Sequence, residues 1–577
     1  MDLTTRLSPS AIRQRTTGPL ILELDLTEGL AESHPTEPIA ALLALRRTRL
    51  LEVLDGLKRA SRDPRVRALV AKVGGGRIGL AKIQDLRDAI IDFRESGKLT
   101  VAWTESFGEF TRGNLPYYLA TAFEKIYLQP TGTLGLTGIA VEQVFVHDAL
   151  AKLGVDFQSA KRYEYKTAAD ALTETGFTEP ARQTAQRLAA SIAEQVAAGI
   201  EQGRGKTPEQ ARELLDRGPF LAQQALDEGL IDALGYRDQV YDEVRRYVGS
   251  EATLQYVGRY VRARALAELP RRATAAREPH VALIYAQGAI RQGRAARGPV
   301  GGSNGIGSDS LTGILRAVTA DERVRAVVMR INSPGGSAVA SDTIWREVVR
   351  ARAAGKPVIV SMGDVAASGG YYIAMSADVI IAQPGTLTGS IGVIMGKPVL
   401  ADLFGRVGVA TDTVAEGANA TMFSASHPFS DEDWSRINAW LDAIYTDFTA
   451  KVASGRGLTP EQVDELARGR VWTGADAKAN GLVDELGGLQ EALAIARRRA
   501  GLSPSAPVRV FPRVSPFEQL RPAESSEARP AAARLSPLAA LAGGAFSEGW
   551  GAFGQLAAAA GMPSAGPLMM PGLWKIS

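Results

Sequence analysis

A serine flanked by glycines is the first candidate for chemistry in the sequence. The β-branched run PVIVSMG (357–363) predicts a strand, and it leads through DVAA to Ser368, Gly369 and Gly370, ahead of the apolar helix YYIAMSA. A serine that follows a strand and begins a helix is placed like a nucleophile. Because serine is also a common helix N-cap, its position alone leaves both interpretations open.

A glycine pair lies at the end of the preceding strand. VRAVVMRIN (324–332) runs directly into SPGGSAVAS (333–341), in which Gly335 and Gly336 let backbone N–H groups face outward at the start of a helix. Such a turn can hold an oxyanion or another anion. A tight strand-to-helix turn without a chemical role is the alternative.

A serine nucleophile needs a base, which is usually histidine and in one variant is a neutral lysine. Lys166 follows two tyrosines and precedes Thr-Ala-Ala in KRYEYKTAAD (161–170), surroundings that favour burial. Burial would lower the pKa of this lysine from ~10.4 toward ~7 to 8, as a base requires. A solvated surface lysine is the other interpretation, and His427 is an alternative base.

An internal repeat organises the chain that must position these residues. VRALVAKV (66–73) recurs as VRAVVMRI (324–331), and EGLIDALG (228–235) recurs as NGLVDELG (480–487). The predicted division is an N-terminal extension at 1–17, a first repeat at 18–245, a linker at 246–278, a second repeat at 279–500 and a C-terminal tail at 501–577.

The two repeats have complementary losses. In their alignment Ser368 falls on Asn114, so the first repeat lacks the hydroxyl. Lys166 of the first repeat falls on Ala420 of the second. One repeat keeps the candidate nucleophile and the other the candidate base, which predicts one site assembled from both.

Each repeat alternates strand-like and helix-like runs. In the second repeat HVALIYAQGAI (280–290) and DVIIAQ (378–383) are strand-like, whereas SDTIWREVVRARAAGK (341–356) is helical. This alternation predicts an α/β fold with parallel-rich sheets and functional residues at the carboxyl ends of strands.

Composition excludes several classes of function. The 577 residues hold 66 Lys plus Arg against 63 Asp plus Glu, so the net charge of +3 gives no reason to expect a nucleic-acid partner. Without cysteine there is no disulfide or thiol nucleophile, and four scattered histidines argue against a metal site. We expect neither metal nor cofactor.

The ends of the chain bear on location. The sequence shows no apolar core of a signal peptide and no ~18-residue apolar span, so we expect a cytoplasmic protein or one peripheral to the membrane. The Ala-, Pro- and Gly-rich tail is predicted to be disordered or loosely docked. It offers Met569, Met570, Leu573 and Trp574 for a weak membrane contact.

At these motifs the sequence resembles the signal peptide peptidase A family in its long, tandem-repeat form. The resemblance rests on INSPGG (331–336), GDVAASGGYYIA (363–374), PGTLTGSIGV (384–393) and YEYKTAAD (163–170). It implies two crotonase-like (Clp protease-like) repeats. It also implies Ser368 as nucleophile, Lys166 as general base, and backbone N–H groups of Gly335, Gly336 and Gly369 as oxyanion donors.

The resemblance also implies an activity and partners. The expected function is a serine endopeptidase that hydrolyses apolar peptides such as cleaved signal peptides, working as a homo-oligomer, with a tetramer implied. Segment TLTGSIGV (386–393) either lines the substrate groove or is a plain buried strand. A crotonase-type acyl-CoA enzyme and a non-catalytic homologue are the alternatives.

Overall fold

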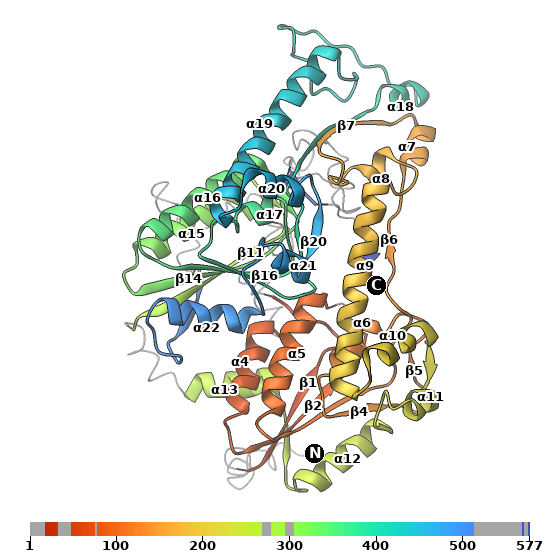
Figure 1. Ribbon diagram of the computed structural model, residues 1–577, viewed down its shortest axis with the longest axis vertical. Helices are drawn as coiled ribbons and strands as arrows, with labels where there is room; N and C mark the ends of the chain where they lie inside the picture. Colours follow the sequence, from red (N-terminus) through yellow and green to blue (C-terminus); the bar gives the residue numbers. More distant parts are fainter. Residues whose placement is uncertain are drawn as a thin grey trace.

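The computed structural model describes residues 18–32, 48–75, 78–267, 278–294, 305–512, 568–570 and 575–576. Figure 1 shows the arrangement of these elements. The extension at 1–17 and two residues proposed for membrane contact, Leu573 and Trp574, lie outside the described residues. Within the described ranges, no helix has the length and apolarity needed to cross a membrane.

The first unit is built on a six-stranded parallel sheet with the strand order β10-β1-β2-β3-β4-β9. Its strands are β1 (Leu20–Asp25), β2 (Val66–Lys72), β3 (Leu99–Thr104), β4 (Lys125–Leu128), β9 (Ala233–Leu234) and β10 (Thr253–Tyr256).

The second unit repeats this order. Strands β22, β11, β14, β16, β17 and β21 are neighbours in that sequence and pair in parallel. Their bounds are Val508–Phe511, His280–Gln287, Val324–Ser333, Val358–Ala367, Val379–Ala382 and Glu485–Leu486. Strands β18 (Leu387–Gly389) and β20 (Val471–Thr473) extend the sheet from β16. The predicted α/β class with two parallel-rich sheets is confirmed.

The closing strand of each sheet corrects the predicted boundaries. Strand β10 lies in the stretch assigned to the linker, and β22 lies in the stretch assigned to the tail. Each completes a sheet by pairing with its first strand. Because this pairing uses backbone hydrogen bonds, the sequences TLQY and VRVF need share no residues, and the repeat was not visible there.

The two units share one core. Helices α4 (Leu50–Ala60) and α5 (Leu80–Arg94) of the first unit and α22 (Leu489–Arg499) of the second lie between the sheets (Figure 1). Their apolar faces meet in one cluster that includes Leu57, Leu86, Val328 and Leu493. The units are therefore packed into a single body through buried side chains.

A strand pair also joins the units. Strand β7 (Asp156–Arg162) of the first unit pairs antiparallel with β19 (Val393–Val399) of the second, so that Arg162 lies opposite Val393. This pairing brings the segment after Arg162, which contains Lys166, beside the second unit.

Two short strands of the predicted C-terminal tail pair with the two units. Strand β23 (Leu568–Met569) joins the second unit, and β24 (Lys575–Ile576) pairs with β6 (Val141–Glu142) of the first. Met569 and Met570 are buried in the fold, which corrects the expectation that they contact a membrane.

Candidate active site

Ser368 lies at the carboxyl end of β16, where α17 (Gly369–Tyr372) begins. Its φ of 54° is rare for a residue with a side chain, and its N–H donates to the Gly389 carbonyl at 2.8 Å. The side chain makes no capping hydrogen bond to the helix, which removes the N-cap interpretation. The hydroxyl is instead held in a fully buried position.

Lys166 is held by a loop of the second unit. Tyr165 N–H donates to the Arg468 carbonyl at 3.2 Å, and the Arg468 guanidinium pairs with Glu164 at 2.9 Å. A Cβ at Gly469 would collide with the backbone of Lys166, so only glycine permits this approach. The lysine therefore belongs to the first unit, although its position is set by the second.

Lys166 and Ser368 meet in the interior. Lys166 Nζ lies 2.8 Å from Ser368 Oγ, and both residues are 0% exposed. Burial holds the pKa of Lys166 well below its ordinary value, because the ammonium form loses its hydration in the interior. A solvated surface lysine is excluded, and this amine favours its neutral form.

Ser390 completes the surroundings of Lys166 and was not singled out from the sequence. Its backbone carbonyl and its Oγ lie 2.9 and 3.1 Å from Lys166 Nζ. It has a φ of 50°, and its N–H donates to the Arg470 carbonyl at 2.7 Å. The only sequence feature that could have pointed to Ser390 was its position in TLTGSIGV, a segment that we interpreted as a groove wall or a buried strand.

The glycine turn lies beside Ser368. A Cβ at Gly335 would be 2.8 Å from the Gly369 nitrogen, and a Cβ at Gly369 would be 3.0 Å from the Gly336 nitrogen. The backbone nitrogens of Gly336 and Gly369 therefore lie close together beside Ser368. The N–H of Gly335 already donates to Ser333 Oγ at 3.2 Å.

The residues that correspond to Ser368 and Lys166 in the opposite unit have neither a hydroxyl nor an amine. Asn114, the counterpart of Ser368, donates through Nδ2 to the Gly138 carbonyl at 2.8 Å and accepts at Oδ1 from Thr137 N–H at 2.9 Å. Ala420, the counterpart of Lys166, is exposed, as is His427. The geometry thus gathers one serine and one lysine, one from each unit.

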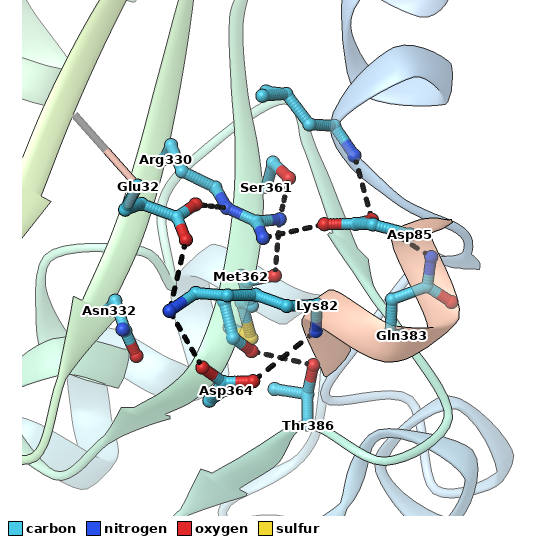
Figure 2. A network of polar contacts seen from close by, with 12 residues as sticks. Glu32, Lys82, Asp85, Arg330, Asn332, Ser361, Met362, Asp364, Gln383 and Thr386 are labelled. Atoms are coloured by element: carbon cyan, nitrogen blue, oxygen red, sulfur yellow. Dashed lines mark hydrogen bonds and ion pairs between the residues drawn. The ribbon is translucent and has the colours of Figure 1, made fainter. Parts of the chain in front are cut away.

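A buried charged network ties the unit that carries Lys166 to the unit that carries Ser368 (Figure 2). Arg330 on β14 is 0% exposed, and its guanidinium pairs with Glu32 at 2.6 Å and Asp85 at 2.7 Å, both from the first unit. It also donates to Ser361 Oγ and the Met362 carbonyl on β16, each at 2.9 Å. The strand that ends next to Ser368 is therefore fixed against the first unit.

The pKa values of the two carboxyl groups that pair with Arg330 are shifted in opposite directions. Burial raises the pKa of Asp85, although Arg330 opposes it. Burial also acts to raise the pKa of Glu32, but Arg330 and Lys82 outweigh it and hold that pKa below its ordinary value. Lys82 lies 3.4 Å from Asp364 of β16 and 3.5 Å from Glu32 (Figure 2), which extends the network across the units.

No cluster of three or more His, Asp or Glu side chains in the described part of the chain is arranged to hold a metal ion. What the site does contain is a buried serine hydroxyl, an amine with a lowered pKa and two converging backbone N–H groups. These are the constituents of a serine hydrolase.

Comparison with known proteins identifies the family. The model of peptidase family S49 matches residues 93–250 and 350–503. The chain is 33% identical to Protease 4 of Salmonella typhi, over 79% of this chain and 73% of that protein. It is 31% identical to the chloroplastic serine protease SPPA of Arabidopsis thaliana, over 78% of this chain and 66% of that protein. The chain therefore belongs to peptidase family S49 and is a serine protease.

Among solved structures, a mutant of ClpP1 from Listeria monocytogenes aligns with 39% of this chain and 99% of its own, at 16% identity and a TM-score of 0.25.

Proposed function

We propose that this protein is an endopeptidase with a Ser-Lys dyad assembled from its two units. Ser368 is the nucleophile and Lys166 is the general base. The observation that carries the proposal is the 2.8 Å contact between Lys166 Nζ and Ser368 Oγ, in a buried site where the lysine pKa is lowered. A neutral amine at hydrogen-bond distance is what proton abstraction from a serine requires.

In the first step Lys166 Nζ takes the hydroxyl proton while Ser368 Oγ bonds to the peptide carbonyl carbon. The backbone N–H groups of Gly336 and Gly369 stabilise the oxyanion, each worth about 3 to 4 kcal/mol by analogy with other hydrolases. The C–N bond then breaks, and Lys166 gives its proton to the leaving amine. Lys166 then takes a proton from a water molecule whose oxygen bonds to the acyl carbon, and it returns that proton to Ser368 Oγ as the ester bond breaks. Gly335, whose N–H is already engaged, contributes by allowing close approach.

The proposed substrates are extended apolar peptides such as cleaved signal peptides. The support is an apolar cluster next to the nucleophile, formed by Leu188, Ala367 and Val471, with Leu387 packed against it. We further propose assembly into a homotetramer and contact with the membrane surface. Light scattering after size-exclusion chromatography and flotation with anionic vesicles test these two points.

The dyad is tested by single substitutions and an active-serine probe. Ser368→Ala and Lys166→Ala are expected to lower kcat on an apolar peptide by at least about 10⁴-fold. Labelling by a fluorophosphonate is expected in the wild type and absent in Ser368→Ala. The matched controls are Ser191→Ala, a buried serine bonded to Thr473, and Lys397→Met, a buried lysine elsewhere.

Several outcomes would contradict the dyad. Wild-type turnover by Lys166→Ala would show that Lys166 is not the general base. Loss of turnover in His427→Ala instead would establish a Ser-His pair. A wild type that neither hydrolyses peptides nor reacts with the probe would favour a crotonase-type or non-catalytic homologue.

A further inference from the structure

A short segment near the C-terminus, Leu568–Met570, contains a strand, β23, that lies beside the candidate site. In β23, Met569 lies opposite Gly335 and Leu568 opposite Gly336, in antiparallel register. Met570 N–H donates to the Pro334 carbonyl at 2.8 Å. The segment thus adds an edge strand to a small sheet with the order β13-β12-β15-β23, in which β15 is the glycine pair itself. Strands β12 and β13 are Ile290–Arg291 and Ile306–Gly307. Extended peptides commonly bind proteins in this way.

The side chains of this segment are buried. Leu568 is 0% exposed and belongs to the core cluster of the second unit. Met570 packs in the cluster with Leu188 of the first unit, and with Ala367 and Val471 of the second. Full burial of a Leu or Met side chain removes a large apolar surface from water, so these two side chains are the main anchors.

The backbone of the segment lies at the proposed oxyanion donors. A Cβ at Gly335 would collide with the Leu568 carbonyl oxygen, and the same point lies 2.8 Å from the Gly369 nitrogen. Ala367, which Met570 contacts, directly precedes the nucleophile. The Leu568 carbonyl therefore occupies the region where the carbonyl of a substrate must bind.

A second contact holds the end of the chain to the other unit. Strand β24 pairs antiparallel with β6, so that Ile576 lies opposite Val141 and Lys575 opposite Glu142. The C-terminal segment therefore binds both units, the same two that supply the dyad. Such bridging favours the segment as a specific ligand of the assembled site over a chance contact with one surface.

We propose that Leu568–Met570 is a tethered competitor that binds in the substrate groove as an extended apolar peptide and must be displaced before a substrate can bind. This inference rests on the proposed peptidase function and deepens it. The groove takes a strand antiparallel to the glycine pair, with Leu- or Met-sized side chains at alternate positions, the second in the pocket formed by Leu188, Ala367 and Val471.

The strength of competition follows from the tether. A tethered ligand has an effective concentration of about 1 mM, so a segment with a Kd of about 0.1 mM would raise the apparent KM about tenfold. A competitor of this kind leaves kcat unchanged, because saturating substrate displaces it.

The kinetic test uses the full chain with Leu568→Asp and Met570→Asp combined, which removes both apolar anchors. The apparent KM for an apolar peptide is expected to fall about tenfold with kcat unchanged. The control is Val414→Asp, which places the same charge at a fully exposed position and should alter neither constant. A chain ended after Gly566 is the second variant, should the double substitution fail to fold.

The binding test does not depend on turnover. A fluorescent peptide with the sequence SAGPLMMPG, which matches residues 564–572, is titrated into Ser368→Ala protein with and without the double substitution. The peptide is expected to bind about tenfold more tightly to the protein with the double substitution, because Leu568–Met570 no longer competes for the same site. Equal binding to both proteins, or binding to neither, would overturn the inference.

The two tests separate this inference from the proposed function. If no variant hydrolyses peptides but the labelled peptide binds more tightly to the disabled protein, the groove inference stands and the peptidase proposal fails. The opposite outcome is that turnover depends on Ser368 and Lys166 while KM and peptide binding are unchanged by the C-terminal substitutions. In that case the tethered-competitor inference is wrong and the peptidase proposal stands.

Discussion

Ser390 presents two acceptors to Lys166 Nζ, its backbone carbonyl at 2.9 Å and its Oγ at 3.1 Å. A neutral amine has two N–H groups and one lone pair. When both N–H groups point at Ser390, the lone pair faces Ser368 Oγ at 2.8 Å and accepts its hydroxyl proton. In the proposed dyad, Ser390 would therefore be a positioning residue, which orients Lys166 without touching the substrate.

Removing the Ser390 hydroxyl should weaken the base without abolishing it. We expect Ser390→Gly to lower kcat about 10- to 100-fold, with little change in KM, because a misdirected lone pair costs about that much. Ser390→Ala keeps the Cβ and therefore the backbone strain of the wild type, whereas Ser390→Gly also relieves that strain, because the φ of 50° suits glycine. Steady-state kinetics and the melting temperature of Ser390→Gly and Ser390→Ala separate the two effects. Wild-type kcat in Ser390→Gly would show that the hydroxyl has no role.

The pH dependence of the reaction should report Lys166. Burial lowers the pKa of this amine in the folded protein, and only the neutral form can accept a proton. The value of kcat/KM is therefore expected to rise with pH through the lowered pKa and to level off well below pH 10.5. In Ser390→Gly this limb should move to lower pH, because the ammonium form loses an acceptor. A limb near pH 10.5 would mean that the lysine is solvated and is not the base.

The sequence was most informative where the two repeats differ. The losses at Asn114 and Ala420 pointed to Ser368 and Lys166 as partners, and the structure brings these two side chains into contact. Their catalytic roles stay predictions until the substitutions are tested. The alternation of apolar runs predicted the α/β class, because strands buried on both faces, such as β16, are almost continuously apolar.

Other features depend on contacts that no local pattern encodes. Ser390 acts through its backbone carbonyl as well as its hydroxyl, and any residue type has a carbonyl. Strands β10 and β22 pair through the backbone, so their sequences need not match. The Ala-, Pro- and Gly-rich composition of the tail predicted disorder, yet three residues, Leu568–Met570, find a specific edge strand and an apolar pocket. The composition of a long segment is an average, and it does not reveal that three of its residues pair with a strand.

Lys166 should lower stability at neutral pH. The unfolded chain binds a proton at this amine up to pH ~10.4, whereas the folded protein favours the neutral form, so this group's cost to stability shrinks as pH rises toward ~10.4. Lys166→Met removes that cost. We expect it to be inactive yet to melt a few degrees higher at pH 7, with the difference from wild type narrowing toward pH 10. A lower melting temperature for Lys166→Met at pH 7 would contradict this account.

Arg330 should contribute far more to stability than an arginine in a surface ion pair. Arg330→Met leaves the buried carboxylates Glu32 and Asp85 without their main partner, which is expected to cost about 3 to 5 kcal/mol. The matched control is Arg323→Met, because Arg323 lies near the start of the same strand but pairs with Asp321 at the exposed surface, where loss of an ion pair costs little stability.

Urea unfolding of the two variants measures the difference, and a third variant assigns its cause. Combining Arg330→Met with Glu32→Gln and Asp85→Asn removes the stranded charges and should recover part of the lost stability. Because the network fixes β16 against the first unit, Arg330→Met should also lower kcat while the folded fraction remains high. Equal losses in Arg330→Met and Arg323→Met would show that the network does not hold the two units together.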